Sequence, residues 1–258
     1  MAAGSVLLIE QDDDGVGLVT LNRPDALNAA NEELHGAIAA VWSELATRSD
    51  LRAVVLTGAG KAFSAGGDLP LLDRMTRDLD LRARIMAEAA MLVRDMTGLP
   101  VPIVSAVNGP AVGLGCSLAS LSDLVVMTED AYFADPHVSL GLVAGDGGAL
   151  TWPLNMGVQR AKEWLLLGGR IAAHEAFSFG LANRVVAPGE AVAEAKKLAR
   201  KLANLPPQAL RETRRVLNQP LVARIDAALD DILAAETNSF DEPAFQRNLT
   251  AMIGRSRA

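Results

Sequence analysis

Two glycine-rich loops, at residues 63–69 and 107–117, each follow an apolar run typical of a strand and lead towards a predicted helix. Glycine permits backbone angles that other residues avoid, and it lets a ligand approach the chain closely. The first turn of a helix leaves backbone N–H groups without partners and carries partial positive charge. Such a pair of loops can direct two N–H donors at one oxygen, which suits stabilisation of an oxyanion or an enolate derived from a carbonyl.

A second group of residues that could do chemistry lies further along the chain. His137 and Asp146 are nine residues apart, and four glycines lie in or beside the interval. Because glycines let the chain turn back, we expect Asp146 to approach His137. An aspartate that orients a histidine and stabilises its protonated form makes that histidine a competent base towards water. The alternative roles are structural, as a hydrogen-bonded histidine and a helix-capping aspartate.

The elements that must position these residues alternate between strand and helix. Strands are predicted at 16–21, 53–57, 102–107, 124–128, 131–134 and 181–186, and helices at 31–48, 81–97, 118–121, 149–154, 158–167 and 173–179. Since parallel strands need crossover connections, this alternation predicts an α/β core with mostly parallel strands. The helices predicted at 190–204, 207–217 and 221–239 form a tail that packs either on a neighbouring subunit or on its own core.

Composition excludes several classes of function. The chain has 258 residues, half of them hydrophobic and 4% aromatic, so its core is aliphatic. A net charge of −7 argues against binding to nucleic acid or an anionic membrane surface. One cysteine, Cys116, excludes an intrachain disulfide and fits a cytoplasmic location. The first ten residues lack the basic region of a secretory signal, no apolar run could span a membrane, and the histidines lack metal-ligand spacing, so we expect no metal.

Five motifs in order resemble the crotonase, or enoyl-CoA hydratase/isomerase, superfamily. They occupy residues 21–28, 56–69, 106–116, 123–126 and 180–186, within a resemblance that covers about residues 5–240. The resemblance implies an α/β spiral of ββα units at 1–190 and a helical C-terminal region at 191–258 used in trimerisation, giving a homotrimer or homohexamer. It also implies an acyl-CoA thioester as substrate, with coenzyme A as part of that substrate and no separate cofactor.

The same resemblance assigns binding residues by their positions in the motifs. The backbone N–H groups of Gly67 and Leu114 match the pair that holds the thioester oxygen. A backbone donor tolerates any side chain but proline, so leucine at 114 is compatible with this role. Arg23 is a candidate for the CoA phosphates, although a solvated arginine in a turn fits equally well. The expected substrate-binding residues are Arg23, Ala26, Ala65, Asp68 and Leu69.

The chain departs from a typical hydratase of the superfamily at its acid/base groups. Ser117 and His137 stand where that hydratase places two glutamates, and a serine cannot act as a carboxylate base. The segment 137–146 resembles instead the subgroup that contains 6-oxocamphor hydrolase, a β-diketone hydrolase in which a His–Asp pair activates water. Glu236 also matches an active-site glutamate there. The loop at 63–69 nevertheless keeps the form typical of CoA-dependent members.

These observations leave three hypotheses about function. The leading one is an acyl-CoA enzyme grouped with enoyl-CoA hydratases and isomerases, in which His137 oriented by Asp146 moves a proton or activates water. The alternatives are a CoA-independent C–C hydrolase acting on a β-diketone and a non-catalytic oligomer that binds acyl-CoA. Outside these roles, Cys116 is expected to be a small buried residue, and His35 and His174 are expected on helices among surface-type residues.

Overall fold

The computed structural model describes residues 5–256, whose main sheet has six strands in the order β1-β2-β3-β4-β6-β9. The first two strands pair antiparallel and every other pairing in this sheet is parallel, which confirms the predicted α/β arrangement. The strands are β1 (Leu7–Gln11), β2 (Val16–Leu21), β3 (Ala53–Gly58), β4 (Ile103–Val107), β6 (Leu124–Thr128) and β9 (Arg184–Val186).

A second, smaller sheet lies beside the glycine-rich loops. It consists of β5 (Ala111–Val112), β7 (Tyr132–Ala134) and β8 (Ile171–Ala172). β5 belongs to the second glycine loop and pairs parallel with β7, while β7 pairs antiparallel with β8. This pairing sets the residues that follow β7 next to those that follow β5. The first of these groups begins with Asp135 and the second with Gly113.

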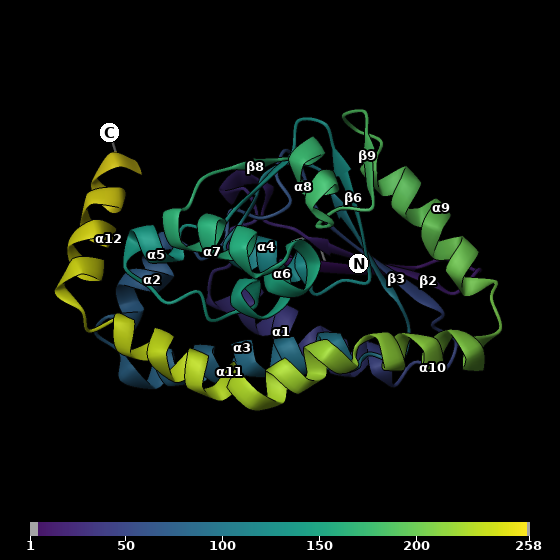
Figure 1. Ribbon diagram of the computed structural model, residues 1–258, viewed down its shortest axis with the longest axis horizontal. Coiled ribbons are helices and arrows are strands. Elements are labelled where there is room, and N and C mark those ends of the chain that lie inside the picture. The colour runs from purple at the N-terminus through teal and green to yellow at the C-terminus, as the bar shows by residue number, and fades with distance from the viewer. Residues whose placement is uncertain (1–4, 257–258) are drawn as a thin grey trace.

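Helices surround both sheets (Figure 1). Those before residue 180 are α1 (Glu32–Ala46), α2 (Leu69–Met75), α3 (Leu79–Gly98), α4 (Leu114–Ser120), α5 (His137–Leu140), α6 (Gly148–Met156), α7 (Val158–Leu167) and α8 (Ala173–Phe179). Those after it are α9 (Ala191–Ala203), α10 (Pro207–Leu217), α11 (Gln219–Ser239) and α12 (Pro243–Ser256). None of the helices within 5–256 is both long and apolar enough to cross a membrane. Residues 1–4, part of the segment read for a secretory signal, lie outside the described residues.

The central strands are buried on both faces, as their uniformly apolar sequences require. Along β3, Ala53 and Val55 pack against α9, whereas Val54 and Leu56 face the larger core that contains α1 and α3. The side chains of successive strand residues point to opposite faces, so one strand serves both cores. Three layers result, with α9 on one face of the sheet and the site-bearing loops and helices on the other.

The C-terminal helices fold back onto their own core. α9 covers the sheet, α11 packs against α3 and α6, and α12 contacts α2 and α5. In Figure 1, α10 and α11 run along one edge of the molecule and α12 turns back over the end opposite α9. Of the two arrangements left open for this tail, the structure therefore shows packing on the same chain for α9, α11 and α12, while much of α10 is exposed.

The elements within 5–256 that were not predicted include β1, α2 and α12, together with the short elements β5, α5 and β8. β1 lies at the edge of the sheet, next to β2, and carries Glu10. Its sequence therefore lacks the continuous apolar run that identifies a central strand. α2 has seven residues and begins inside the glycine-loop motif, where Asp68 accepts a hydrogen bond from the Leu71 N–H as its N-cap. α12 is joined to α11 through a Phe240–Phe245 contact, a tertiary interaction that no local pattern reveals.

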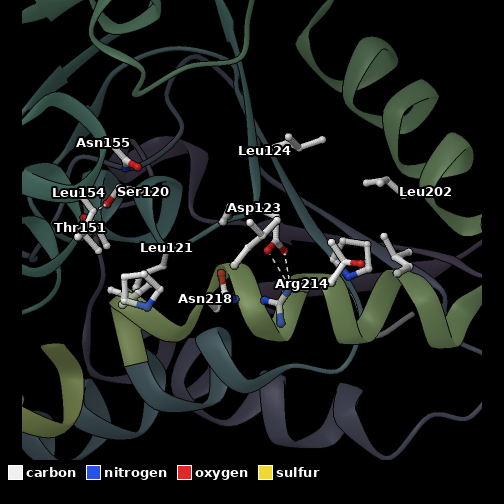
Figure 2. Close-up of a pocket in the computed structure, with 17 residues that line it drawn as sticks. Ser120, Leu121, Asp123, Leu124, Thr151, Leu154, Asn155, Leu202, Arg214 and Asn218 are labelled. Atoms are coloured by element: carbon white, nitrogen blue, oxygen red, sulfur yellow. Dashed lines mark hydrogen bonds and ion pairs between the residues drawn. The ribbon is translucent and has the colours of Figure 1, made fainter. Parts of the chain in front are cut away.

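A buried arginine attaches α10 to the rest of the fold (Figure 2). Arg214 Nε donates to both carboxylate oxygens of Asp123 at 2.8 Å, and its other nitrogens donate to the backbone carbonyls of Met96, Thr97 and Leu99. These carbonyls lie at the C-terminal end of α3, where helix carbonyls lack partners within the helix and favour positive charge. The Arg214 guanidinium therefore donates hydrogen bonds both to the carbonyls at the end of α3 and to the carboxylate just before β6.

We expect Arg214→Ala to lower the free energy of unfolding by about 3 kcal/mol, because the half-buried Asp123 carboxylate loses its charged partner and the Met96 and Leu99 carbonyls lose their donor. Urea denaturation followed by circular dichroism measures this loss. Arg211→Ala is the matched control, since among the described residues Arg211 pairs only with its neighbour Glu212 at the surface. The control should leave the midpoint unchanged, and an equal loss in both variants would contradict the proposed attachment.

Candidate functional site

The two glycine loops lie against each other through backbone contacts. The Val112 N–H donates to the Ser64 carbonyl at 2.8 Å, and the Phe63 and Ser64 N–H groups donate to the Pro110 carbonyl at 3.1 Å. Gly66 has φ +88°, a backbone conformation that residues with a side chain rarely adopt. A methyl group there would also stand 2.7 Å from the Val112 carbonyl oxygen, which is too close. Glycine at this position is what allows the two loops to meet.

Two backbone N–H groups of these loops are free. Within residues 5–256, neither Gly67 nor Leu114 donates its N–H to a protein acceptor. Leu114 is the first residue of α4, so its N–H is one of those that a helix leaves unpaired. The neighbouring residues Gly66 and Gly113 both have positive φ and pack against each other. The loops thus present the pair of donors that stabilisation of a carbonyl oxyanion requires.

A cavity of about 470 Å³ opens beside this pair of donors. Its lining includes Gly67 and Leu114, both members of the expected pair His137 and Asp146, and Glu236 from α11. Four expected substrate-binding residues also line it: Ala26, Ala65, Asp68 and Leu69. Most of the remaining wall is apolar, contributed by Leu71, Leu72, Met75, Ile85, Met86, Ala89, Leu140, Leu142, Phe240 and Met252. An elongated apolar group with one carbonyl near the free donors suits this lining.

Arg23 is placed differently from the other expected binding residues. It does not line the cavity. Its guanidinium pairs with Asp68 at 3.1 Å and donates to the Ala29 carbonyl, so it holds the loop before α1 against the N-cap of α2. The structure therefore gives Arg23 a role in positioning the cavity wall.

His137 lies between two carboxylates. Its Nδ1 lies 2.6 Å from Asp135 Oδ1, and its Nε2 lies 3.9 Å from Asp146 Oδ2. The expected approach of Asp146 to His137 is therefore present, but Asp135 makes the close hydrogen bond that orients the ring. Asp135 also accepts the His137 backbone N–H at 3.1 Å, the geometry of an Asx turn across Asp-Pro-His. That local signal could have identified Asp135 from the sequence.

Asp146 has a second partner in Ser117. The Ser117 hydroxyl donates to Asp146 Oδ1 at 2.7 Å and also lies 3.5 Å from the Gly113 carbonyl. Gly147 has φ +148°, and a methyl group there would stand 2.9 Å from Ser117 Cβ. This close approach brings Asp146, just before α6, against α4. Ser117 thus positions a carboxylate beside the cavity.

The electrostatics of the cluster favour a protonated His137. Burial alone would lower the pKa of the ring, but the negative charges of Asp135 and Asp146, together with the Asp135 hydrogen bond, raise the pKa of His137 from 6.5 to about 10. The ring therefore carries a positive charge at neutral pH. This differs from the expected role of His137 as a base, because a base must start without the proton.

Glu236 is the third buried acid at the cavity. Its pKa is raised from 4.5 to about 8, first by burial and further by the charges of Asp146 and Asp135, with His137 opposing the shift. Its Oε2 has no hydrogen-bond partner within the described residues and packs against Gly145, where a methyl group would stand 2.2 Å away. At neutral pH Glu236 is therefore a neutral acid that lines the same cavity as Asp146.

Three further residues were considered in the sequence: Cys116, His174 and His35. Cys116 is fully buried and its pKa is raised well above the usual value, first by burial and then by the charge of Asp135, so it stays a thiol. His174 does not line the cavity. His35 does line it and is only 6% exposed, so its expected position among surface residues is wrong.

Another cavity, of about 510 Å³, lies between α10 and the sheet and is drawn in Figure 2. Its only ionisable lining residues, Asp123 and Arg214, are paired with each other. It shares no lining residue with the cavity beside the glycine loops and is separate from the His137 cluster. The cavity beside the glycine loops is therefore the candidate active site.

Comparisons with known proteins point to one family. The family model for enoyl-CoA hydratase/isomerase matches residues 11–253. A short-chain-enoyl-CoA hydratase of Clostridium acetobutylicum is 34% identical over 91% of this chain and 88% of its own length. A 1,2-epoxyphenylacetyl-CoA isomerase of Escherichia coli is 33% identical over 86% of each chain. The crystal structure of an enoyl-CoA hydratase/isomerase from Mycobacterium paratuberculosis superposes with a TM-score of 0.93 at 46% identity, over 97% of this chain and 100% of that one. This chain belongs to the enoyl-CoA hydratase/isomerase family.

Proposed function

We propose that this family member binds an acyl-CoA thioester and stabilises its enolate with the backbone N–H groups of Gly67 and Leu114, while Asp146 moves the proton. The observation that carries the proposal is the placement of two free donors and an ordered carboxylate on one largely apolar cavity. Hydrogen bonds to the thioester oxygen make the protons on the neighbouring α-carbon more acidic. A carboxylate beside the same cavity can then accept one of them.

The three acids and the histidine divide the proton chemistry between them. Asp146 is the base, Glu236 is the neutral acid, and His137 is a cation held by Asp135 that balances the negative charge. Environments that separate the protonation states of two acids are how one site performs both acid and base steps. In this proposal Asp146 and Glu236 do the work of paired glutamates. Such a pair serves either migration of the double bond or addition of water.

Deuterium exchange tests the enolate directly, whatever the complete reaction is. We expect butyryl-CoA incubated with the protein in D2O to gain deuterium at the α-carbon, detected by mass spectrometry. Unreactive protons with tight CoA binding would overturn the proposal and favour the non-catalytic acyl-CoA-binding oligomer. Turnover assays with crotonyl-CoA, a 3-enoyl-CoA and a β-ketoacyl-CoA then separate hydration, isomerisation and C–C hydrolysis.

The second candidate is a CoA-independent hydrolase that cleaves a cyclic β-diketone. The 3.9 Å approach of Asp146 to His137 Nε2 favours it, because a His–Asp pair can activate water. The protonated state of His137 weighs against it, since water activation requires a ring without that proton. Cleavage of a cyclic β-diketone by protein that binds no CoA would establish this alternative.

The proposal needs coenzyme A only as part of the substrate. Every group assigned a step is a backbone N–H or a side chain of this chain, so no further cofactor enters. The single cysteine is buried and unpaired within the described residues, which supports a reducing, cytoplasmic location.

We also propose that the chain forms a homotrimer or homohexamer. Large apolar side chains are exposed on the outer faces of α7, α8 and α10, a feature typical of surfaces buried between subunits. They are Leu166, Leu167, Phe177, Val216 and Leu217. Light scattering after size exclusion should give three or six times the mass of one chain, and a monomer at micromolar concentration would exclude this assembly.

Asp135→Asn should make His137 lose its proton at lower pH. The substitution removes a negative charge 2.6 Å from Nδ1, and we expect the pKa of His137 to fall by about 1–3 units because burial is then less opposed. Histidine NMR signals can follow this titration, since the chain has three histidines and His137→Gln assigns the signal.

The same shift sets a pH dependence of stability. Because the folded pKa of His137, about 10, exceeds the ordinary 6.5, its contribution is fully present below 6.5 and is lost as pH rises to 10. In Asp135→Asn the contribution of His137 to stability should be fully lost at a lower pH than in the wild type. A His137 titration unchanged by the substitution would contradict the assignment of Asp135 as the positioning residue.

A further inference from the structure

A buried histidine in the apolar part of the cavity wall is unexplained by the proton chemistry above. His35, on α1, is 6% exposed and lines the cavity together with the apolar residues Ile85, Met86 and Ala89 of α3. An isolated polar ring in such a wall is costly unless both nitrogens find partners. Its partners therefore indicate what the cavity is built to receive.

One nitrogen of the ring has a partner outside the cavity. His35 Nδ1 lies 2.7 Å from Glu88 Oε2, and the Glu88 side chain is 17% exposed. Glu88 does not line the cavity but lines a neighbouring surface recess with Arg74 and Arg84. The carboxylate thus holds the ring from the side of that recess. With the Nδ1 hydrogen donated to Glu88, the orientation of the ring is fixed.

The other nitrogen is unused by the protein. His35 Nε2 makes no hydrogen bond within residues 5–256 and is not among their fully enclosed unpaired atoms. Because Nδ1 bonds a carboxylate that lines the recess and the ring itself lines the cavity, Nε2 is the ring nitrogen left available to the cavity. The wall that surrounds the acyl group therefore offers one fixed polar atom, separate from the free N–H groups of Gly67 and Leu114.

We propose that His35, oriented by Glu88, is a specificity residue that binds a hydroxyl group on the acyl chain of the CoA thioester. The inference rests on the proposed acyl-CoA function and narrows its substrate class to acyl-CoA thioesters that carry a hydroxyl at C4 or beyond. A hydroxyl both donates and accepts, so it pairs with Nε2 whether or not that nitrogen carries a hydrogen. A carboxylate on the acyl chain fits less well because the negative charge of Glu88 stands behind the ring.

An unsubstituted acyl chain in the same place leaves Nε2 without a partner. A buried polar group left unpaired costs about 1–3 kcal/mol, which corresponds to roughly 5- to 150-fold in affinity. Sites built to hydrogen-bond a substrate hydroxyl discriminate against the analogue that lacks it for this reason. The preference should therefore appear in the comparison of each hydroxyacyl-CoA with its own alkyl counterpart.

Calorimetry with matched thioesters tests the inference. The probes are butyryl-, hexanoyl- and octanoyl-CoA and their 4-, 6- and 8-hydroxy derivatives, titrated into the wild-type chain and His35→Leu. We expect a hydroxyl to tighten binding by about tenfold or more at one chain length in the wild type. His35→Leu should lose this preference and bind the alkyl thioester as well or better, while Glu88→Gln should reduce the preference in part.

The outcomes separate the two proposals. A wild-type chain that binds alkyl thioesters but gains nothing from a hydroxyl at any length overturns the role of His35 alone. A hydroxyl preference that survives His35→Leu does the same. Failure of every CoA thioester to bind overturns the proposed function and this inference with it. Met86→Leu is the control for the apolar wall and should leave the hydroxyl preference unchanged.

Discussion

Asp146→Asn is expected to lower kcat by about 10³-fold and leave KM and the melting temperature nearly unchanged. Asparagine keeps the shape of aspartate and can still accept the hydrogen bond from the Ser117 hydroxyl. It cannot accept a proton from the α-carbon. The loss should appear equally in turnover of an enoyl-CoA and in deuterium exchange of butyryl-CoA, because both require the same proton to leave.

Ser117→Ala provides a graded comparison at the same carboxylate. The serine only positions Asp146, so we expect its removal to slow exchange by about tenfold, consistent with the loss of one hydrogen bond to a charged group. Glu236→Gln should impair turnover more than exchange, since it removes the acid and keeps the base. Exchange that persists in Asp146→Asn and disappears in Glu236→Gln would reverse the assignment of base and acid.

Local sequence determines much of the conformation of the two glycine-rich loops. The glycines mark positive φ angles and a close approach of two backbones, and the start of α4 follows directly from the loop. These are properties of short segments, so the motifs at 56–69 and 106–116 could be interpreted without knowing the tertiary structure. The choice of Gly67 and Leu114 within those motifs came from the resemblance to the crotonase superfamily, and the structure places both residues on one cavity.

The His137 cluster shows where local reasoning stops. The nine-residue interval with its glycines predicted the approach of Asp146, and the structure gives 3.9 Å. The same reasoning assigned the orienting hydrogen bond to the wrong acid, because Asp135 is two residues away and its turn was overlooked. The protonation of His137 depends on burial and on several charges at once. The spacing of residues in the sequence cannot predict the combined effect of burial and these charges on the pKa of His137.

Contacts between distant segments bring Glu236 and His35 to the cavity. Glu236 reaches the cavity from α11, about 90 residues after Asp146, because α11 packs on α3 and α6. His35 lies one residue beyond the apolar stripe of α1, and it is buried only because α3 packs beside it and supplies Glu88. Periodicity identifies which face of a helix is apolar, but the width of the face that a neighbour covers depends on packing.

Gly66→Ala is expected to reduce kcat/KM by at least about 10²-fold, comparable to the loss of an oxyanion donor. The alanine must adopt φ near +88° and place its methyl group 2.7 Å from the Val112 carbonyl oxygen, so either Gly66 or the second loop moves. Either movement separates the free N–H groups of Gly67 and Leu114. The strain should also lower the free energy of unfolding by about 1–3 kcal/mol.

Gly98→Ala is the matched control for the glycine substitution. Gly98 ends α3, has no positive φ, and has no atom within 4 Å of an added methyl group. Because alanine restricts the unfolded chain, this variant should keep full activity and be unchanged or more stable by up to about 1 kcal/mol. Steady-state kinetics and urea denaturation of both variants make the comparison. Full turnover in Gly66→Ala would mean that the close contact of the loops does not set the donor geometry, and the enolate would then need another source of stabilisation.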